Sequence, residues 1–403
     1  MSHFQAPPQG DFHSYADLTA KQAGHLDKIT QWSEAQCAHT DGLDGLLLLA
    51  REIVPDVSHF FSGKLAQCRR GMGVVEDRVH RTSADYAKAD DQARSDLRTI
   101  YPDALPHFPD IGSLPGAHRV GNYTDEDVPL KEPAGAEDDT EKNIHLQLLA
   151  LGRGSELRGA DKVFTFCTGQ SLVELLLDPL VGKYGRLKYL HDAYDAMGDA
   201  VYTVAGTLRK GSWALGSEWQ GQAAQGFDSY LFRWTMGMGG IGDAAKEAAK
   251  AFKAGYEAIV VLVHAALREI DKLIKNEIRQ LAEQAAEMAA GDAAIETVGL
   301  GPEDPLADIG AGVYTAYKLY KIYKIVRAVI TAITLIEEIF QKISEAVKAI
   351  QSDIRKISEA LSSPMPSVGS LINDVEQRGF EFEKSGGWSS AAGAARIGLL
   401  PAA

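Results

Sequence analysis

The chain has 403 residues, 45% of them hydrophobic, and a formal net charge of −14. This length suits roughly two or three domains with a sizeable core. The acidic balance argues against nucleic acid as the main partner, because a protein that neutralises phosphates needs a basic surface. Three cysteines are too few for a disulfide scaffold and lack the spacing of a zinc site. For Cys37 and Cys68 two alternatives stay open: a disulfide across antiparallel helices, or two buried free thiols.

The N-terminal stretch MSHFQAPPQGDFHSY lacks the basic region and the apolar region of a secretory signal peptide. No stretch reaches about 18 consecutive apolar residues, so no ordinary transmembrane helix is predicted. These rules place the protein in the cytoplasm, or on an export route that does not read an N-terminal signal.

Residues 1–101 are predicted to form a helical hairpin. In its first helix one face is apolar at helical spacing, with Gln22 as a polar gap; the apolar positions are Tyr15, Leu18, Leu26, Ile29 and Trp32. The stretch HTDGLDG at 39–45 breaks this helix. A second helix follows to about residue 101, and Pro55 is expected to start or kink it.

Residues 102–178 differ in composition from the hairpin. They are rich in Pro, Gly and acidic residues without a sustained period, which predicts an irregular linker draped on the surface. Within it, KVFTFCTGQ at 162–170 is interpreted as a short strand, although no partner strand is evident.

Residues 179–290 are predicted to form a second hairpin, with one helix over 179–210 and another over 222–290. The second helix carries a buried line at steps of three, four or seven: Ala248, Phe252, Ile259, Val263, Leu267, Ile270, Ile274, Ile278 and Leu281. The stretch GMGGIGD at 237–243 lacks the preceding strand and the Lys-Ser/Thr of a phosphate loop. It is therefore interpreted as an interruption of the helix.

Residues 291–362 are predicted to be a loop followed by a long amphipathic helix from about 312, and 363–403 a flexible tail. From Val329 to Leu361 the helix has a heptad seam: Val329, Ile333, Ile336, Phe340, Ile343, Val347, Ile350, Ile354, Ile357 and Leu361. Such a seam requires a partner helix, in this chain or in a second chain. The predicted class is all-α: two long hairpins, an irregular acidic linker, an extra C-terminal helix and a tail.

The joint of the second hairpin reads GSWALGSEWQGQAAQGF, over 211–227. Gly211, Gly216 and Gly221 are expected to permit the turn. The rings of Trp213 and Trp219 are expected to cover the open end of the hairpin. A capped, glycine-permitted turn explains most of this pattern without any function.

The same stretch resembles the Trp-Xaa-Gly (WXG) family of type VII secretion substrates, over roughly 180–290. Those proteins are helical hairpins with Trp-Xaa-Gly at the turn, followed by small residues and an aromatic. The matching positions are Trp219, Gly221, Ala223, Ala224 and Phe227. The resemblance implies a bacterial, secreted helical protein whose partner is the type VII secretion machinery.

At the end of the first hairpin, ADYAKADDQARSD contains Tyr86 and Asp90 as Tyr-Xaa-Xaa-Xaa-Asp. This pattern is similar to the general type VII export signal. Spacing of four puts the ring and the carboxylate on one helix face, where a receptor could read them. The alternative interpretation is an ordinary exposed helix face with a tyrosine at its edge.

Each hairpin carries one of the two family features. The first has no Trp-Xaa-Gly at its turn, and in the second Tyr256 is followed four residues later by Val260. In WXG dimers the export signal of one chain lies close to the Trp turn of its partner. We therefore predict that this chain fuses both partners, with Tyr86/Asp90 and Trp219/Gly221 forming one composite signal across a four-helix core.

A second pattern lies in the last helix. Tyrosines recur every three residues, and basic residues follow at the same interval: Tyr314, Tyr317, Tyr320, Tyr323, Lys318, Lys321, Lys324 and Arg327. Tyr and Lys at the edge of an apolar run are typical of a membrane interface. The alternative is a core helix whose Tyr and Lys stems cover neighbouring helices.

No constellation for catalysis is evident. The eleven histidines are scattered, without a His-Xaa-Xaa-Xaa-His pair near a glutamate. Cys167 lies near Ser171 but has no histidine close in sequence, and a buried cysteine is the commoner case. No catalytic residue, metal site or cofactor is predicted.

The prediction is a secreted, non-enzymatic type VII substrate, carrier or structural component, with attachment to the cell surface as a further option. Its partners would be the secretion machinery and, through the seam 329–361, a partner helix or another chain. The alternative is a membrane-active, pore-forming effector that uses helix 314–340.

Overall fold

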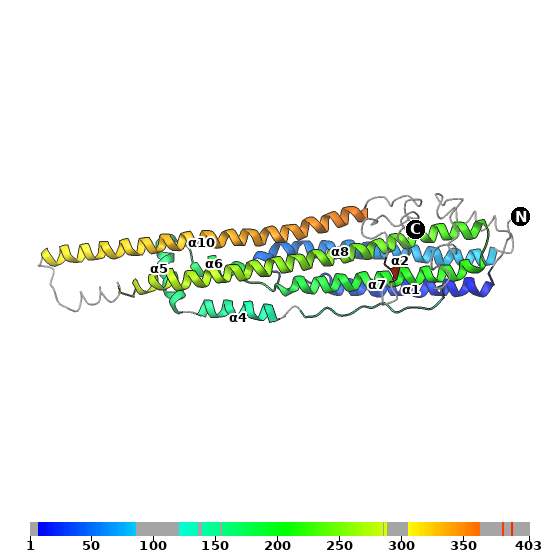
Figure 1. The fold of residues 1–403 in the computed structure, drawn as a ribbon, viewed down its shortest axis with the longest axis horizontal. Helices are drawn as coiled ribbons and strands as arrows, with labels where there is room; N and C mark the ends of the chain where they lie inside the picture. Colours follow the sequence, from blue (N-terminus) through cyan, green and yellow to red (C-terminus); the bar gives the residue numbers. More distant parts are fainter. Residues whose placement is uncertain are drawn as a thin grey trace.

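The structure, a computed structural model, describes residues 7–85, 121–135, 139–153, 155–284, 286–287, 305–362, 381–382 and 388–389. The described chain is helical apart from connecting segments and one pair of short strands, so the predicted all-α class is confirmed. Strands β1 (Glu381–Phe382) and β2 (Trp388–Ser389) pair antiparallel. Figure 1 shows an elongated molecule whose long helices run along one axis.

Four helices form a core of two antiparallel hairpins. The first hairpin joins α1 (Gln9–Gln36) to α2 (Leu48–Asp85) through the 3-10 helix η1 (Gly45–Leu47). The second joins α7 (Gly185–Glu218) to α8 (Gln222–Leu273). α1 packs against both α2 and α7, and α7 packs against α8. This is the four-helix core that the two apolar stripes require.

The hairpins lie antiparallel to each other, with their turns at opposite ends. The Lys183 N–H, just before α7, donates a hydrogen bond of 2.6 Å to the carbonyl of Gly42 in the first hairpin's turn. At the other end the ring of Trp219 contacts the ring of Phe12, near the start of α1. The Trp219 turn therefore lies beside the start of α1 and the end of α2.

The apolar stripe of α1 is buried as its spacing predicts, at Tyr15, Leu18, Leu26 and Ile29. The chain leaves helical structure within 37–44, so the break at HTDGLDG is observed. Pro55 lies inside α2, about two turns after its first residue, Leu48. Because its nitrogen would otherwise donate to the carbonyl of Arg51 within α2, Pro55 removes one intrahelical hydrogen bond and does not start the helix.

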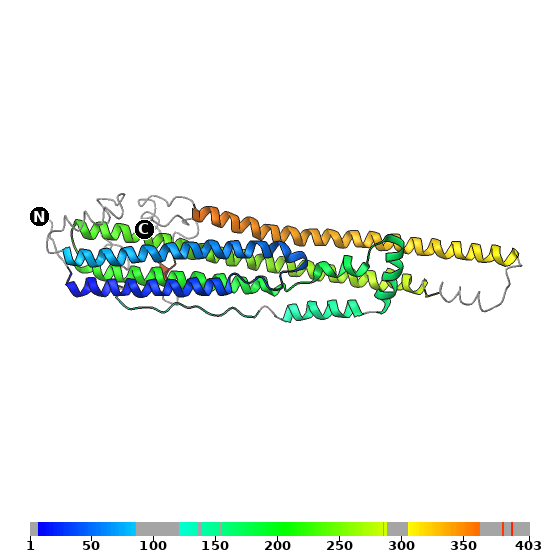
Figure 2. The ribbon, with the colours of Figure 1, turned by 180° about the vertical axis from the view of Figure 1, so that it is seen from behind.

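Helix α8 continues past the four-helix core into a π-turn, η5 (Ile274–Ile278), and then a helical stretch at 279–284. Helix α10 (Pro305–Ser362) returns along it. We call residues 256–284 and 305–349 together the outer arm; Figures 1 and 2 show it extending beyond the other helices.

The heptad seam of α10 has its partner helix within the same chain, namely α8. All seam residues are buried except Ile357, which is half-buried. A Cβ placed on Gly255 of α8 would collide with the side chain of Ile350, so the two helices approach closely there. At the end of α10, the Lys64 ammonium donates a 3.3 Å hydrogen bond to the Leu361 carbonyl, which joins α10 to α2.

The segment 102–178 is only partly irregular, which corrects the prediction of a linker. It contains α4 (Asp139–Arg153), α5 (Ser155–Thr168) and α6 (Leu172–Leu176), followed by η4 (Asp178–Leu180). α4 packs against α8, and α5 packs against η5. These contacts with the outer arm supply the apolar surface that makes short helices stable.

The prediction of a strand at 162–170 is wrong, because most of this stretch belongs to α5, which ends at Thr168. Phe164 is buried while Phe166 is 91% exposed. Such alternation over three residues reads as period two, yet it also fits opposite sides of a helix. Cys167 is exposed, contrary to the expectation of a buried thiol.

Residues 121–135 form an extended segment, here called the strap, that follows α7 along the surface (Figure 2). Asp125 accepts hydrogen bonds from Gln22 at 2.6 Å and contacts His25 Nε2 at 3.0 Å. Glu126 pairs with Lys210 at 2.5 Å. Gln22, the polar gap in the apolar face of α1, therefore binds the strap to this helix.

The stretch GMGGIGD does not interrupt α8, which corrects the prediction. A Cβ on Gly242 would lie 2.6 Å from the Tyr202 ring and 3.2 Å from the Gly198 carbonyl oxygen, both in α7. Gly242 thus permits the close approach of α7 and α8. Packing between α7 and α8 offsets the cost of about 1 kcal/mol that glycine brings to a helix interior.

Asp243 ends that stretch and is buried between α7 and α8. Its Oδ1 accepts a hydrogen bond from the Tyr202 hydroxyl. Burial raises the pKa of Asp243 from its ordinary 3.8 to about 7, against the opposing effect of the Tyr202 hydrogen bond. The core therefore holds a carboxyl group that titrates near neutral pH.

Replacing Asp243 with asparagine is expected to stabilise the protein most above pH 7. The folded chain keeps the proton up to about pH 7 and the unfolded chain loses it from about pH 4, so the free energy of unfolding falls as pH rises through this window. The difference between the two pKa values corresponds to at most about 4 kcal/mol. Urea unfolding of Asp243→Asn and wild type from acid to alkaline pH measures it. Exposed Glu34→Gln is the control, and a stability difference independent of pH would contradict the prediction.

Cys37 and Cys68 are both buried and free, so the disulfide alternative is not observed. Arg69 of α2 pairs with Asp27 of α1 at 2.8 Å, so its neighbour Cys68 lies near the height of Asp27 along the axis of α1. Cys37 lies ten residues beyond Asp27, a helical rise of about 15 Å. Burial raises the pKa of Cys37 to about 12 and raises that of Cys68 as well.

Among the described residues, no helix is both long enough and apolar enough to cross a membrane.

Candidate functional site at the Trp219 turn

The turn of the second hairpin is Trp219–Gln220–Gly221, between the last residue of α7 and the first of α8. Gly221 has φ +124°, a conformation that side chains with a Cβ rarely adopt. Gly211 and Gly216 lie inside α7, which corrects their assignment to the turn. A Cβ on Gly211 would lie 2.7 Å from the Leu18 side chain and 2.9 Å from the Tyr15 ring, so this glycine serves the contact between α1 and α7.

The Trp219 ring closes this end of the core and is only 3% exposed. It packs edge-on against Phe12, with ring centroids 4.9 Å apart, and tilted against Phe227 at 5.4 Å. Phe227 in turn meets Tyr15 edge-on at 5.6 Å. Aromatic pairs in such arrangements add about 0.5–1.5 kcal/mol each beyond their buried area. The turn therefore joins α1, α7 and α8.

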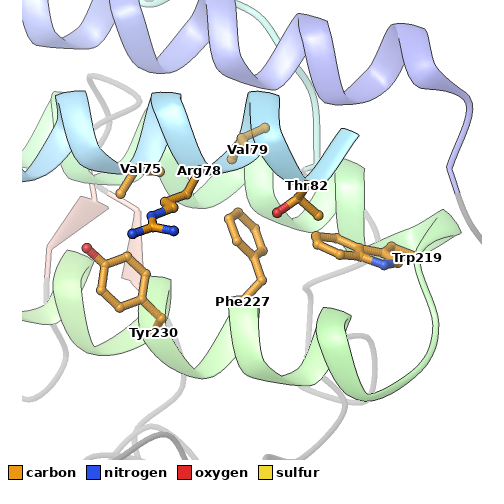
Figure 3. Close-up of a pocket in the computed structure, with 7 residues that line it drawn as sticks. All are labelled: Val75, Arg78, Val79, Thr82, Trp219, Phe227 and Tyr230. Carbon is orange, nitrogen blue, oxygen red and sulfur yellow. The ribbon is translucent and has the colours of Figure 1, made fainter. Parts of the chain in front are cut away.

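The end of α2 completes the cluster. A small apolar cavity lies between α2 and the turn, shown in Figure 3; its lining residues are Val75, Arg78, Val79, Thr82, Trp219, Phe227 and Tyr230. In Figure 3, Thr82 of α2 lies beside the Trp219 ring. The Phe227 ring points from α8 toward Val79 of α2. We call these residues with Phe12 and Tyr15 the aromatic end. Helices α1, α2 and α8 contribute to it, together with Trp219 of the turn that follows α7.

A buried guanidinium lies behind the aromatic end. Arg209 of α7 is fully buried, and its Nε and both Nη atoms have no hydrogen-bond partner among the described residues. Its guanidinium carbon lies 4.9 Å from the Phe232 ring centroid and 5.8 Å from that of Trp213. Burial lowers its pKa to about 10, while Asp228 and Tyr15 act in the opposite direction. Arg209 is therefore charged at neutral pH, and aromatic faces stabilise that charge.

The structure brings together Trp219, Gly221 and Phe227, with Trp213 buried one turn and a half before the end of α7. Tyr86 and Asp90 lie outside the described residues, which end at Asp85 on this side. Sequence reasoning missed the contributions of Phe12 and of α2. Helical periodicity could have indicated Val75, Val79 and Thr82, which recur at steps of four and three.

The other predicted residues lie in the outer arm. Tyr317, Tyr320 and Tyr323 are 56%, 58% and 61% exposed, so they do not cover neighbouring helices as the core-helix alternative expects. Lys321 and Lys324 are exposed as well. The side chain of Lys318 lies outside the described residues. These residues therefore belong to a separate surface.

The aromatic end is a packed surface and not a chemical pocket. Within the described residues, no group of three or more His, Cys, Asp or Glu side chains could hold a metal ion. What the arrangement offers is a rigid, mostly apolar end with the charged Arg78 at its edge. Its aromatic rings are all buried, so the residues that another protein could contact at this end are exposed Gln220 and half-buried Gly221 and Arg78.

The fold and this end define the class: an elongated all-α protein of two antiparallel hairpins, closed at one end by an aromatic cluster around a Trp-Xaa-Gly turn. In comparisons with protein-family models, curated proteins and solved structures, nothing matches the chain.

Proposed function

We propose that this protein is a non-enzymatic substrate, carrier or structural component of type VII secretion. Its export signal would be composite, with Tyr86 and Asp90 after α2 and Trp219 and Gly221 at the turn of the second hairpin. Its partner would be the type VII machinery, and its destination the medium or the cell surface.

One observation carries the proposal: the end of α2 and the Trp219 turn line the same cavity, through Thr82 and Trp219. Tyr86 follows Thr82 by four residues, so their Cα atoms are at most about 15 Å apart. The chain therefore cannot carry Tyr86 to the far end of the core, where the two motifs would be unable to act together.

The arrangement of the hairpins adds support. In WXG dimers two hairpins pack so that the signal of one lies near the turn of the other. Here α1 and α2 pack against α7 and α8 with their turns at opposite ends. This packing of two hairpins within one chain is consistent with the proposal that the chain fuses both partners of such a dimer.

Secretion from a type VII-competent host tests the proposal. We expect Tyr86→Ala and Asp90→Ala to reduce the protein in the medium by at least about tenfold, the effect of losing a recognition contact worth ~1.4 kcal/mol. Trp219→Ala should have a similar effect. Immunoblots of medium and cell fractions measure the ratio, with purified variants checked for folding by circular dichroism.

Matched controls separate recognition from folding. Asp91→Ala removes a neighbouring acid with the same change in charge and should be secreted normally. Trp234→Ala removes another buried tryptophan, which faces Gly71 in the middle of the core and not the aromatic end. Normal secretion of folded Tyr86→Ala and Asp90→Ala would refute the composite signal. Equal loss in Trp219→Ala and Trp234→Ala would assign the Trp219 effect to folding.

A further inference from the structure

One stretch of α10 has a charge opposite to that of the whole protein. Residues 309–336 contain four basic residues and no acidic one, in a chain of net charge −14. Its exposed members form what we call the tyrosine–lysine face: Tyr317, Tyr320, Lys321, Tyr323, Lys324 and Arg327. This face lies in the outer arm.

Within the part of the chain that the structure describes, the tyrosine rings of this face are left largely uncovered. The side of α10 that packs on α8 in this region consists of buried Ile322, Val326 and Val329. Three aromatic rings, each more than half exposed, therefore contribute little to the core. Large rings left in water at helical spacing indicate a surface for binding.

On this face, two lysine ammonium groups each lie close to a tyrosine ring. The Lys321 ammonium lies 5.4 Å from the Tyr317 ring centroid, and that of Lys324 lies 5.7 Å from the Tyr320 centroid. Each pair places a cation beside an aromatic ring with a polar tip. This combination occurs where one side of a helix meets lipid headgroups, because the ring enters the apolar boundary and the cation reaches phosphate.

Neighbouring acids neutralise only part of the charge. Glu277 and Glu283 of the α8 side line a groove with Lys321 and Lys324. Of these two acids, Glu283 pairs with Arg279 at 3.2 Å, so it only partly offsets the charge of Lys321 and Lys324. Arg327 is exposed and is not among the residues that line this groove. The net positive charge therefore remains on the tyrosine–lysine face.

We propose that the tyrosine–lysine face binds the surface of an anionic membrane, with α10 lying along the lipid headgroups. The occupant follows from charge complementarity and from the tyrosines, which suit an interface better than an aqueous protein surface. The helix would adsorb and not span the bilayer, in contrast to the pore-forming alternative. This inference does not rest on secretion, since it concerns only the outer arm.

Vesicle co-sedimentation of the full-length protein tests this proposal. We expect binding to phosphatidylcholine vesicles that contain phosphatidylglycerol, weaker binding at high salt, and little binding to pure phosphatidylcholine. The triple variant Lys321→Gln, Lys324→Gln, Arg327→Gln should bind roughly a hundredfold more weakly, because each basic residue near such a surface contributes about fivefold. Tyr317→Ser with Tyr320→Ser and Tyr323→Ser should weaken binding without changing its salt dependence.

The control is a second triple variant on the same helix: Lys348→Gln, Arg355→Gln and Lys356→Gln. It makes the same change in net charge in a stretch where Asp353 already pairs with Lys356 and Glu359 with Arg355. Equal loss in both triple variants, or equal binding to neutral vesicles, would overturn the proposal. Release of a trapped dye on binding would also overturn it, because it would indicate insertion into the bilayer. If the protein sedimented without vesicles and the tyrosine variant did not, the occupant of the face would be a second copy of the chain.

Discussion

Trp219→Ala is expected to lower the free energy of unfolding by about 3–5 kcal/mol, as for other buried aromatic side chains cut to alanine. The indole fills the end of the core between Phe12 and Phe227 and is almost completely buried. Its removal would enlarge the cavity at the end of α2, which cannot collapse because four helices meet there. Urea unfolding followed by far-UV circular dichroism measures the loss.

Two variants set the scale for this result. Trp219→Phe keeps a ring between Phe12 and Phe227, so it should lose less than half as much. Phe166→Ala removes a ring that is 91% exposed, and its effect should lie within about 0.5 kcal/mol. A loss below about 1 kcal/mol for Trp219→Ala would contradict the packing described for the aromatic end.

Gly242→Ala is expected to destabilise the protein by about 1–3 kcal/mol, the usual cost of overpacking. The added methyl would lie 2.6 Å from the Tyr202 ring, and that ring is buried and held by its hydrogen bond to Asp243. The Gly198 carbonyl, 3.2 Å away, belongs to the backbone of α7 and blocks the other side. Thermal and urea unfolding report the change.

The matched control, Gly24→Ala, is expected to change the free energy of unfolding in the opposite direction. Gly24 lies exposed in α1, and nothing would lie within 4 Å of a Cβ there. Gly24→Ala should therefore stabilise the protein by about 0.5–1 kcal/mol through helix propensity alone. If Gly242→Ala were stabilising to the same degree, α7 and α8 would have to lie farther apart than the structure has them.

Periodicity predicted most of the fold because long helices bury one continuous stripe. The line from Ala248 to Leu281 and the seam from Val329 to Leu361 are both buried apart from half-buried Ile274 and Ile357, and they pack on each other. The sequence left open whether the partner of the seam lay in this chain. Only the return of α10 along α8, a matter of tertiary arrangement, decides it.

The predictions that the structure corrects have a common physical origin. α4 and α5 are short, and their stability comes from contacts with α8 and η5 that no local pattern encodes. The glycines of GMGGIGD look like a helix breaker locally, whereas Gly242 among them leaves room for the ring of Tyr202 in α7. At the candidate site, the turn residues could be predicted from their spacing. For α2, the periodicity of Val75, Val79 and Thr82 indicates a buried face. It does not indicate that this face meets Trp219, because that contact depends on how the two hairpins pack.

Helix α8 runs unbroken from the Trp219 turn into the outer arm, about 78 Å for its 52 residues. Each residue of a helix advances the azimuth by about 100°, so one residue inserted in α8 between core and arm would rotate everything beyond it by that angle. Seven residues added to both α8 and α10 would lengthen the arm by about 10 Å and change its azimuth by only about 20°. The direction in which the tyrosine–lysine face points, relative to the aromatic end, is thus set by the number of residues between them.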